Sequence, residues 1–436
     1  MSHKISIERQ MTYKENSRNL FSSSNLITFN SSAFIPLIAI FLMHLSGCTG
    51  PIEQEVGEVA ESHAESSSPI DGKWDSTEET NTPLSCSMLP KGWSPNFVHK
   101  MNGDQQFEGW YYRISDPQRD ESWVVITAYW RNKVGETRAF IELIQGSTGA
   151  TFKRVFEGLE LETFQAQEGE FELWIGDVLF SAEQVSGSFE DEEGSLVLID
   201  LHFEACALWG APEDERNRWT MGWVTELPGP PLKWHVHHLK GEARGRIAVE
   251  RGEENVLDTS LERAPVHQEK NWGSAFPKRW VWMQSNVFTG RPDVAFAAAG
   301  GPVFGFDLSP EGYMMGLRLR DRFYNWRTQE GHSFKDVDLV LDVAQRRLTW
   351  GLTAESLRYR AVVKAVAPLD ELIAIDVPGQ EGLEFGAFEH LSADLTIDLY
   401  EREGLSWRWI DQVHSPLTAV EAGGEFAERL VEERAR

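Results

Sequence analysis

Hydrophobic and polar residues alternate with a period of two along most of the chain beyond residue 105, and this alternation restricts the fold more than any other feature. In "SLVLIDLHFEA" (195–205), Val197 and Ile199 share one face with the later apolar residues, whereas Asp200 and His202 occupy the opposite face. A period of two is the pattern of a half-buried β-strand. The chain is therefore predicted to be built from strands.

The same pattern recurs at residues 336–343 and 394–401, and residues 122–130 are apolar on both faces. Turn residues separate these runs, as in antiparallel β-proteins. The chain also contains 17 Trp and 24 Phe, and such large rings suit a barrel interior better than a sandwich core. We predict an all-β fold of two antiparallel β-barrels, with one short helix in residues 424–436.

The N-terminal region has the features of a bacterial export signal. Basic residues precede an apolar run, Ala33 to Leu45, which is too short to span about 30 Å of hydrocarbon. The run ends in Leu-Ser-Gly-Cys, which resembles a lipoprotein processing box and implies cleavage and acylation at Cys48. A plain secretory peptide, or a start at Met11, is the alternative. We expect a lipid-anchored protein of the cell envelope that faces the periplasm, at the outer membrane.

Composition divides the chain into four segments. Residues 1–48 are the predicted signal peptide, and residues 49–95, with nine acidic residues and two lysines, form an acidic tether too polar to fold. The first barrel is expected at 96–265 and the second at 266–436.

The formal net charge of −27 argues against nucleic acid and anionic lipid head groups as partners. Beyond Cys48, the spacing of Cys86 and Cys206 does not decide whether they pair.

Two stretches of the first predicted barrel combine polar and aromatic residues. In "FEGWYYRI" (107–114), alternation places Glu108 on the same face as Trp110. Such a carboxylate either forms hydrogen bonds that hold neighbouring strands together or is desolvated with a raised pKa. We favour the structural role for Glu108. In "KWHVHH" (233–238), His235 and His237 share one strand face.

The two histidines and a following glutamate match only the front of a cupin-type metal motif. Glu242 stands at the expected spacing, but the later elements of that motif are missing. We therefore interpret His235 and His237 as structural or substrate-contacting residues, and predict no metal site.

The stretch "HQEKNWGSAFPKRWVWMQSN" (267–286) concentrates an acid, amides and indoles. If it is extended, Glu269 shares a face with Asn271, whereas Lys270 and Trp272 lie opposite. A glutamate among rings can stay protonated near neutral pH and act as a general acid. The alternative is a structural pairing of Glu269 with Lys270 or Arg279. Downstream, the residues that share a face are Trp280, Trp282, Gln284 and Asn286.

These stretches resemble the tocopherol cyclase family. "FEGWYYRI", "EKNWGSAFPKRWVWMQSNVF" and "SPLTAVEAGG" (415–424) occur here in the family's order, over roughly residues 105–425. The resemblance implies paired lipocalin-like barrels, in a wider group with carotenoid hydratases. It also implies an intramolecular lyase that closes a chromanol ring on a prenylated benzoquinol and needs no cofactor. Two departures from the family are "SPNFVHKMNGDQQ" before "FEGWYY" and the His-rich strand.

From the residues and this resemblance we predict a site for an apolar prenylquinol or similar isoprenoid. Glu269 is the expected proton donor or orients it, and Glu108 is the reserve. The expected substrate-binding residues are Trp110, His235, His237, Asn271, Trp272, Trp280, Trp282, Gln284 and Asn286. A non-catalytic carrier of isoprenoid quinones or other lipids is the alternative, and a cupin-like metal enzyme using His235, His237 and Glu242 is a third reading.

Overall fold

The computed structural model describes most of the chain beyond residue 105. Described are the strand Leu26–Asn30 and residues 106–435, apart from 133, 158–171, 211–218, 228–229, 305–308, 321 and 380–381. The tether at 49–95, the acylation site at Cys48 and all of the predicted signal peptide except that strand lie outside the described residues. Those interpretations stay predictions.

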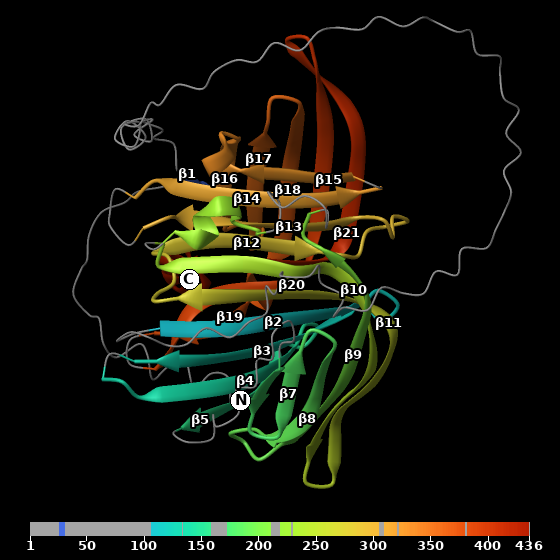
Figure 1. The fold of residues 1–436 in the computed structure, drawn as a ribbon, viewed down its shortest axis with the longest axis vertical. Coiled ribbons are helices and arrows are strands. Elements are labelled where there is room, and N and C mark those ends of the chain that lie inside the picture. The colour runs from blue at the N-terminus through green and yellow to red at the C-terminus, as the bar shows by residue number, and fades with distance from the viewer. Residues whose placement is uncertain are drawn as a thin grey trace, which may run out of the picture. The chain divides into compact units, whose positions relative to one another are not determined.

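The first sheet has ten antiparallel strands in the order β5-β4-β3-β2-β11-β10-β9-β8-β7-β6. Its strands are β2 (Gln106–Asp116), β3 (Glu121–Arg131), β4 (Thr137–Gln145), β5 (Ala150–Glu157), β6 (Glu172–Ile175), β7 (Val178–Ser181), β8 (Gln184–Glu190), β9 (Leu196–Leu208), β10 (Leu232–Arg251) and β11 (Glu254–Gly273). Phe152 of edge strand β5 and Leu173 of edge strand β6 belong to one buried cluster. The sheet therefore curls around a shared interior to form a barrel (Figure 1).

The alternation predicted for residues 195–205 is present in β9. Val197 and Ile199 are buried in the first barrel, whereas Asp200 and His202 are exposed. This one-sided burial is expected for an antiparallel strand with its other face toward solvent.

The second sheet has eleven strands. Their order is β1-β16-β17-β18-β20-β21-β12-β13-β14-β15, and β19 pairs with β20. The strands are β1 (Leu26–Asn30), β12 (Arg279–Ser285), β13 (Ala295–Pro302), β14 (Glu311–Leu319), β15 (Arg322–Arg327), β16 (Ser333–Asp342), β17 (Arg347–Glu355), β18 (Tyr359–Pro368), β19 (Ile373–Pro378), β20 (Leu383–Glu403) and β21 (Ser406–Gly424). Trp326 of β15 and Trp350 of β17 lie in its buried core, so this sheet also curls into a barrel. The all-β, two-barrel prediction is confirmed.

Helices are few among the described residues. They are α2 (Glu425–Arg434) and the 3₁₀ turns η5 (Gly222–Glu226), η6 (Thr328–Glu330) and η7 (Leu369–Glu371). The helix α2 coincides with the segment predicted to be helical, and Ala427 and Leu430 bury its apolar face in the second core. Within the described part of the chain, no helix has the length and hydropathy needed to span a bilayer.

The change from one sheet to the other occurs later in the chain than the expected boundary between 265 and 266. β11 continues in the first sheet to Gly273, and the second sheet resumes at Arg279. Residues 250–255, a charged stretch shortly before the expected boundary, form the turn of the long β10–β11 hairpin, where Arg251 pairs with Glu254. A turn inside one sheet and a connection between sheets have the same composition, so composition did not separate them.

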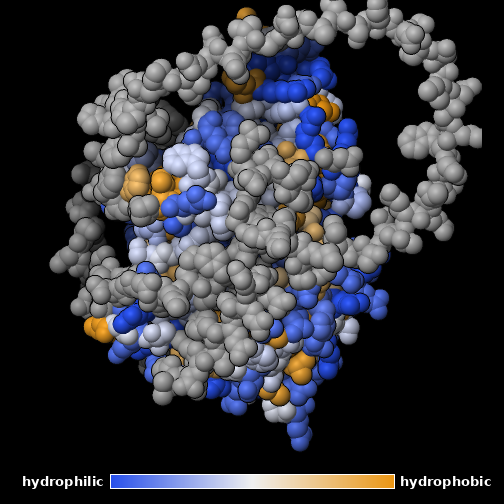
Figure 2. Space-filling model, in the orientation of Figure 1, coloured by the Kyte–Doolittle hydropathy of each residue, from blue (hydrophilic) through white to orange (hydrophobic). Residues whose placement is uncertain are grey.

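Side chains on the outward faces of the two sheets pack against each other. Val124 and Ile144 of the first sheet belong to one buried cluster with Trp282 and Ile375 of the second. We call the space between these faces the inter-sheet layer. Figure 2 shows that hydrophilic side chains dominate the described surface on the face drawn, with hydrophobic residues in separate patches.

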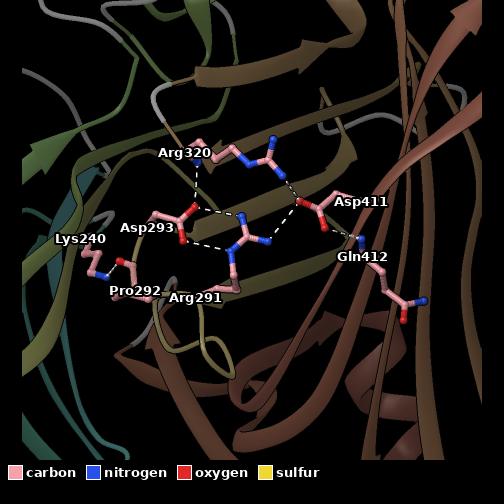
Figure 3. A network of polar contacts seen from close by, with 7 residues as sticks. All are labelled: Lys240, Arg291, Pro292, Asp293, Arg320, Asp411 and Gln412. Carbon is pink, nitrogen blue, oxygen red and sulfur yellow. Dashed lines mark hydrogen bonds and ion pairs between the residues drawn. The ribbon is translucent and has the colours of Figure 1, made fainter.

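A polar network ties the β12–β13 connection to its neighbours (Figure 3). Arg291 donates two hydrogen bonds to Asp293, at 3.0 and 2.9 Å, and a third to Asp411 of β21 at 3.1 Å. Lys240 of β10 donates to the carbonyl of Pro292. This connection is therefore held to both sheets.

Candidate functional site

Strand β11 lies between two buried polar clusters because its side chains alternate between its two faces. Glu269 accepts a hydrogen bond from the indole N–H of Trp282 in the second sheet, at 3.1 Å. Lys270 points the other way, into the first barrel, where its ammonium group pairs with Glu108. The residues that the sequence places next to one another are thus divided between two sites.

The inter-sheet layer contains three acidic side chains close together. Glu389 of β20 lies directly opposite Glu421 of β21, and Glu421 lies opposite Trp282 of β12. Cross-strand pairs have Cβ atoms about 4.5–5.5 Å apart. Glu269 faces the same row from β11 and is bonded to its Trp282. We call Glu269, Glu389 and Glu421 the carboxyl cluster.

An aromatic donor contacts each member of the carboxyl cluster. The Tyr111 hydroxyl donates to Oε1 of Glu389 at 2.5 Å, and the Trp280 indole donates to Glu421. The Trp282 indole donates to Glu269 in the same way. The Trp282 ring packs edge-on against the Tyr111 ring, with centroids 5.4 Å apart. The acids are therefore lined by ring faces and edges.

A histidine adds a further contact to this cluster. Nε2 of His267, on the same face of β11, lies 2.9 Å from Oε2 of Glu269, and the imidazole and the carboxyl group are both buried. Glu269 is consequently held between a histidine of its own strand and an indole of the second sheet.

Burial and mutual repulsion keep protons on this cluster. Burial, and then the charge of Glu421, raises the pKa of Glu389 to about 8. Burial, and then the charge of Glu269, raises the pKa of Glu421 to about 7. Like charges this close in a low-dielectric layer do not all ionise together. At neutral pH the cluster therefore contains at least one neutral carboxylic acid.

Polar groups beside the carboxyl cluster are only partly satisfied. Arg113, fully buried on β2, donates to Oε1 of Gln284 at 2.9 Å and to the carbonyls of Leu391 and Leu417 at 2.9 and 3.1 Å. Burial lowers the pKa of Arg113 to about 10, so it stays charged at neutral pH.

Several buried atoms in this region, and in the residue just after β12, have no hydrogen-bond partner in the described structure. They are Nε2 of Gln284, Oε2 of Glu389 and both amide atoms of Asn286. Buried polar atoms are nearly always hydrogen-bonded, because leaving them unpaired costs free energy. These atoms are therefore candidates for contact with a bound ligand.

The first barrel contains the second polar cluster. Glu108 accepts hydrogen bonds from the Tyr129 hydroxyl and from Lys270. The Lys270 ammonium lies 5.3 Å from the Trp110 ring centroid and 4.9 Å from that of Trp272. A cavity of about 60 Å³ reaches this cluster, and Glu108, Tyr129 and Trp272 are among its lining residues. Glu108 thus ties β2, β3 and β11 together, as the favoured interpretation expected.

The histidines of β10 also face the first barrel. Nδ1 of His235 lies 3.2 Å from the Thr220 hydroxyl, and its ring centroid is 5.0 Å from that of His237. Burial and the neighbouring His235 hold the pKa of His237 well below its ordinary value. Neither ring nitrogen of His237 has a hydrogen-bond partner in the described structure.

The structure does not assemble the metal set considered from the sequence. Glu242 forms a two-point ion pair with Arg263 and is partly exposed, whereas His235 and His237 are buried. Across the described residues no group of three potential ligands is close enough to hold a metal ion.

The predicted site residues therefore divide into two groups. The inter-sheet layer receives Glu269, Trp280, Trp282 and Gln284. The first barrel receives Glu108, Trp110, Trp272, His235 and His237. Asn271 is half-buried between Lys270 and Trp272 on β11, and Asn286 is buried just after β12.

Sequence reasoning missed five residues of the inter-sheet site. One is His267, which belongs to the stretch 267–286. Tyr111 and Arg113 belong to "FEGWYYRI", and Glu421 belongs to "SPLTAVEAGG", so both stretches had been singled out without these side chains. Glu389, in "GAFEHL", had no distinguishing signal. Its place in the carboxyl cluster follows only from the pairing of β20 with β21, which sets Glu389 opposite Glu421.

Comparison with known proteins identifies the family of this chain. The tocopherol cyclase-like family matches residues 178–424, more than half of the chain. The chain belongs to this family.

Two plant proteins are among its relatives. A probable chloroplastic tocopherol cyclase of Oryza sativa subsp. japonica is 28% identical over 222 residues, which is 50% of this chain and 44% of that protein. The chloroplastic tocopherol cyclase of Zea mays is 27% identical over 225 residues, again 50% and 44%. The match thus spans less than half the length of these relatives.

Solved structures also match the chain at low sequence identity. Kievitone hydratase from Nectria haematococca is 12% identical, with a TM-score of 0.41 over 79% of this chain and 98% of that one. CghA with Sch210972 is 10% identical, with a TM-score of 0.43 over 79% and 93%.

Proposed function

We propose that this chain is an acid-catalysed cyclase that closes a chromanol ring on a prenylated benzoquinol or a similar isoprenoid. Membership of the tocopherol cyclase-like family supports this proposal. The observation that carries it is the carboxyl cluster, in which Glu389 lies opposite Glu421 in a buried, aromatic-lined layer. An alkene is a weak base, so its protonation needs a carboxylic acid that is still neutral near pH 7.

The proposed reaction is an isomerisation. The carboxyl cluster gives one proton to the alkene carbon, and a tertiary carbocation forms at the neighbouring carbon. The phenol oxygen then forms a C–O bond to that cation and loses its own proton, which returns to the cluster. Protons and electrons balance without an oxidant or reductant. The faces of Trp280, Trp282 and Tyr111 are suited to stabilise the cation.

Within the cluster the roles differ. Glu389 delivers the proton, because its Oε2 has no partner among the described residues and its pKa is raised to about 8. Glu269, the donor expected from the sequence, acts beside it, since its charge favours protonated Glu421 and Glu389. Gln284 and Asn286 offer amide groups for the quinol hydroxyls.

Turnover of a prenyl benzoquinol in detergent micelles tests this proposal. Glu389→Gln should fold and lose roughly 10²–10⁴-fold in rate, the usual contribution of a general acid. Glu269→Gln, which removes only the charge that favours protonated Glu389 and Glu421, should fold and lose less. Glu142→Gln is the matched control. Glu142 is buried and its pKa is raised to about 7, but the charged groups that act on it are Lys153, Asp376 and Glu192. It should retain wild-type turnover.

Other outcomes reject the proposal in defined ways. Loss of turnover in Glu108→Gln alone would move the acid to the first barrel. If folded wild-type protein binds the quinol but forms no chromanol, the carrier alternative replaces the cyclase. A chromanol formed at full rate by Glu389→Gln and Glu269→Gln would remove the carboxyl cluster from the chemistry.

A further inference from the structure

Two neighbouring hairpin turns of the second barrel expose leucines almost completely. Leu357 lies in the turn between β17 and β18, and Leu405 in the turn between β20 and β21. The two residues are 93% and 101% exposed. The two hairpins are adjacent because β18 pairs with β20 (Figure 1). We call residues 356–360 and 401–409 the double tip.

Hydrogen bonds fix the two turns to each other. The backbone N–H of Arg402 donates to the carbonyl of Arg358 at 2.8 Å, and its Nε donates to the carbonyl of Leu357 at 3.0 Å. Arg358 also binds the carboxylate of Glu401 at 2.9 Å. The exposed leucines are therefore held on an ordered platform.

Aromatic and cationic side chains lie on the same two hairpins as the leucines. The guanidinium groups of Arg360 and Arg402 lie 4.5 and 4.1 Å from the ring centroid of Trp407. Trp409 is 55% exposed. The double tip contains four arginines and two glutamates, although the whole chain has a net charge of −27. The net charge of the whole chain disfavours anionic lipids as partners. It does not describe the double tip, where the arginines outnumber the glutamates.

We propose that the double tip docks on a phospholipid bilayer surface. Leu357 and Leu405 enter the boundary of the acyl chains, Trp409 lies at the level of the head groups, and the arginines contact lipid phosphates. Leucine, tryptophan and arginine prefer these successive depths. Acidic groups farther from the tip than about 8 Å are screened at physiological salt. The net positive charge of the tip, with four arginines against two glutamates, favours a phosphate-bearing lipid surface.

Vesicle binding tests this inference independently of catalysis. The full chain is made by cell-free synthesis without membranes, so that no acyl group is attached at Cys48. It is then sedimented with vesicles of phosphatidylcholine and phosphatidylglycerol in equal parts. Replacing both leucines (Leu357→Asp and Leu405→Asp) should weaken binding roughly tenfold or more, since two buried leucine side chains are lost. Both positions are fully exposed, so folding should be unaffected.

Val256→Asp is the matched control, because Val256 is an exposed aliphatic residue beside the β10–β11 turn in the first sheet. It should bind vesicles like the wild type. Fluorescence of Trp409 provides a second measurement: vesicles with brominated lipid should quench the wild type more than Trp409→Phe. Equal binding by the double variant and the wild type would overturn the proposal. Absence of vesicle binding by the wild type would also overturn the proposal. A protein partner for the double tip would then be favoured.

Discussion

Glu389 shows how one side chain acquires its chemistry from its surroundings. Its carboxyl group is completely buried, lies opposite Glu421 and accepts a hydrogen bond from Tyr111. Burial and the second acid raise its pKa, while the Tyr111 bond and Arg113 lower it. Burial has the largest effect on the pKa, because the free energy lost when a carboxylate leaves water exceeds the free energy gained from one phenol hydrogen bond.

The same shift makes protein stability depend on pH. The pKa of Glu389 rises from about 4.5 to about 8 on folding, so between these values the folded protein retains a proton that the unfolded chain releases. The stability contributed by that proton is complete below pH 4.5 and is lost as pH rises through 8. Glu389→Gln does not titrate, so at pH 8 its free energy of unfolding should exceed that of the wild type by roughly 2–4 kcal/mol.

Urea denaturation at pH 5 and at pH 8 measures this difference. The advantage of the variant should shrink toward pH 5, where wild-type Glu389 is protonated in the folded state. Exposed Glu254→Gln is the control and should follow the wild type at both values. Parallel curves for Glu389→Gln and the wild type would contradict the raised pKa.

At the scale of elements, the pairing of β12 with β21 explains the glycines of "SPLTAVEAGG". Gly423 lies opposite Trp280, and a Cβ atom on Gly423 would stand 2.0 Å from the indole ring. Trp280 therefore lies flat on the backbone of β21, where its N–H reaches Glu421. The missing side chain of Gly423 creates the space for this contact.

Gly423→Ala should displace the Trp280 ring and break its hydrogen bond to Glu421. We expect a loss of about 1–3 kcal/mol in stability, the usual cost of overpacking, together with lower turnover. The control is Gly382→Ala, because the nearest atom to a Cβ at Gly382 is Nη1 of Arg138 at 3.8 Å. Thermal unfolding and turnover of both variants measure the effect. An unchanged Gly423→Ala protein would mean that Trp280 has room to move.

At the scale of the whole molecule, buried and partly buried polar contacts join the two barrels. Arg113 of the first sheet donates to Gln284 and to two carbonyls of the second. Lys153 of β5 pairs with Asp376 of β19 at 2.5 Å. Because a buried guanidinium is costly unless all its partners are in place, Arg113 makes the two barrels depend on each other.

Arg113→Ala should destabilise the protein by about 3–5 kcal/mol, the range for breaking a buried charged network. It should also separate one cooperative unfolding transition into two, since the barrels lose a shared contact. Differential scanning calorimetry resolves the transitions. Arg119→Ala, which removes an arginine that is half exposed in its pair with Asp116, should change stability by about 0–1 kcal/mol. A single, unshifted transition in Arg113→Ala would show that the barrels are coupled by other contacts.

The sequence by itself determined the strands and the faces on which their side chains lie. Alternation placed Glu108 with Trp110 and separated Glu269 from Lys270, and the structure has both arrangements. These assignments succeed because successive side chains on a strand point to opposite sides, a local property of the backbone.

Only the tertiary structure decided which faces meet. Near its turn, the β20–β21 hairpin pairs Glu403 with Ser406, and that register continued without interruption would place Val420 opposite Glu389. Register shifts along the hairpin bring Glu421 there instead. A slip of one residue exchanges the two faces of a strand, and no local pattern marks it. The carboxyl cluster therefore arises from strand register and from the packing of two barrels, which the period of two does not encode.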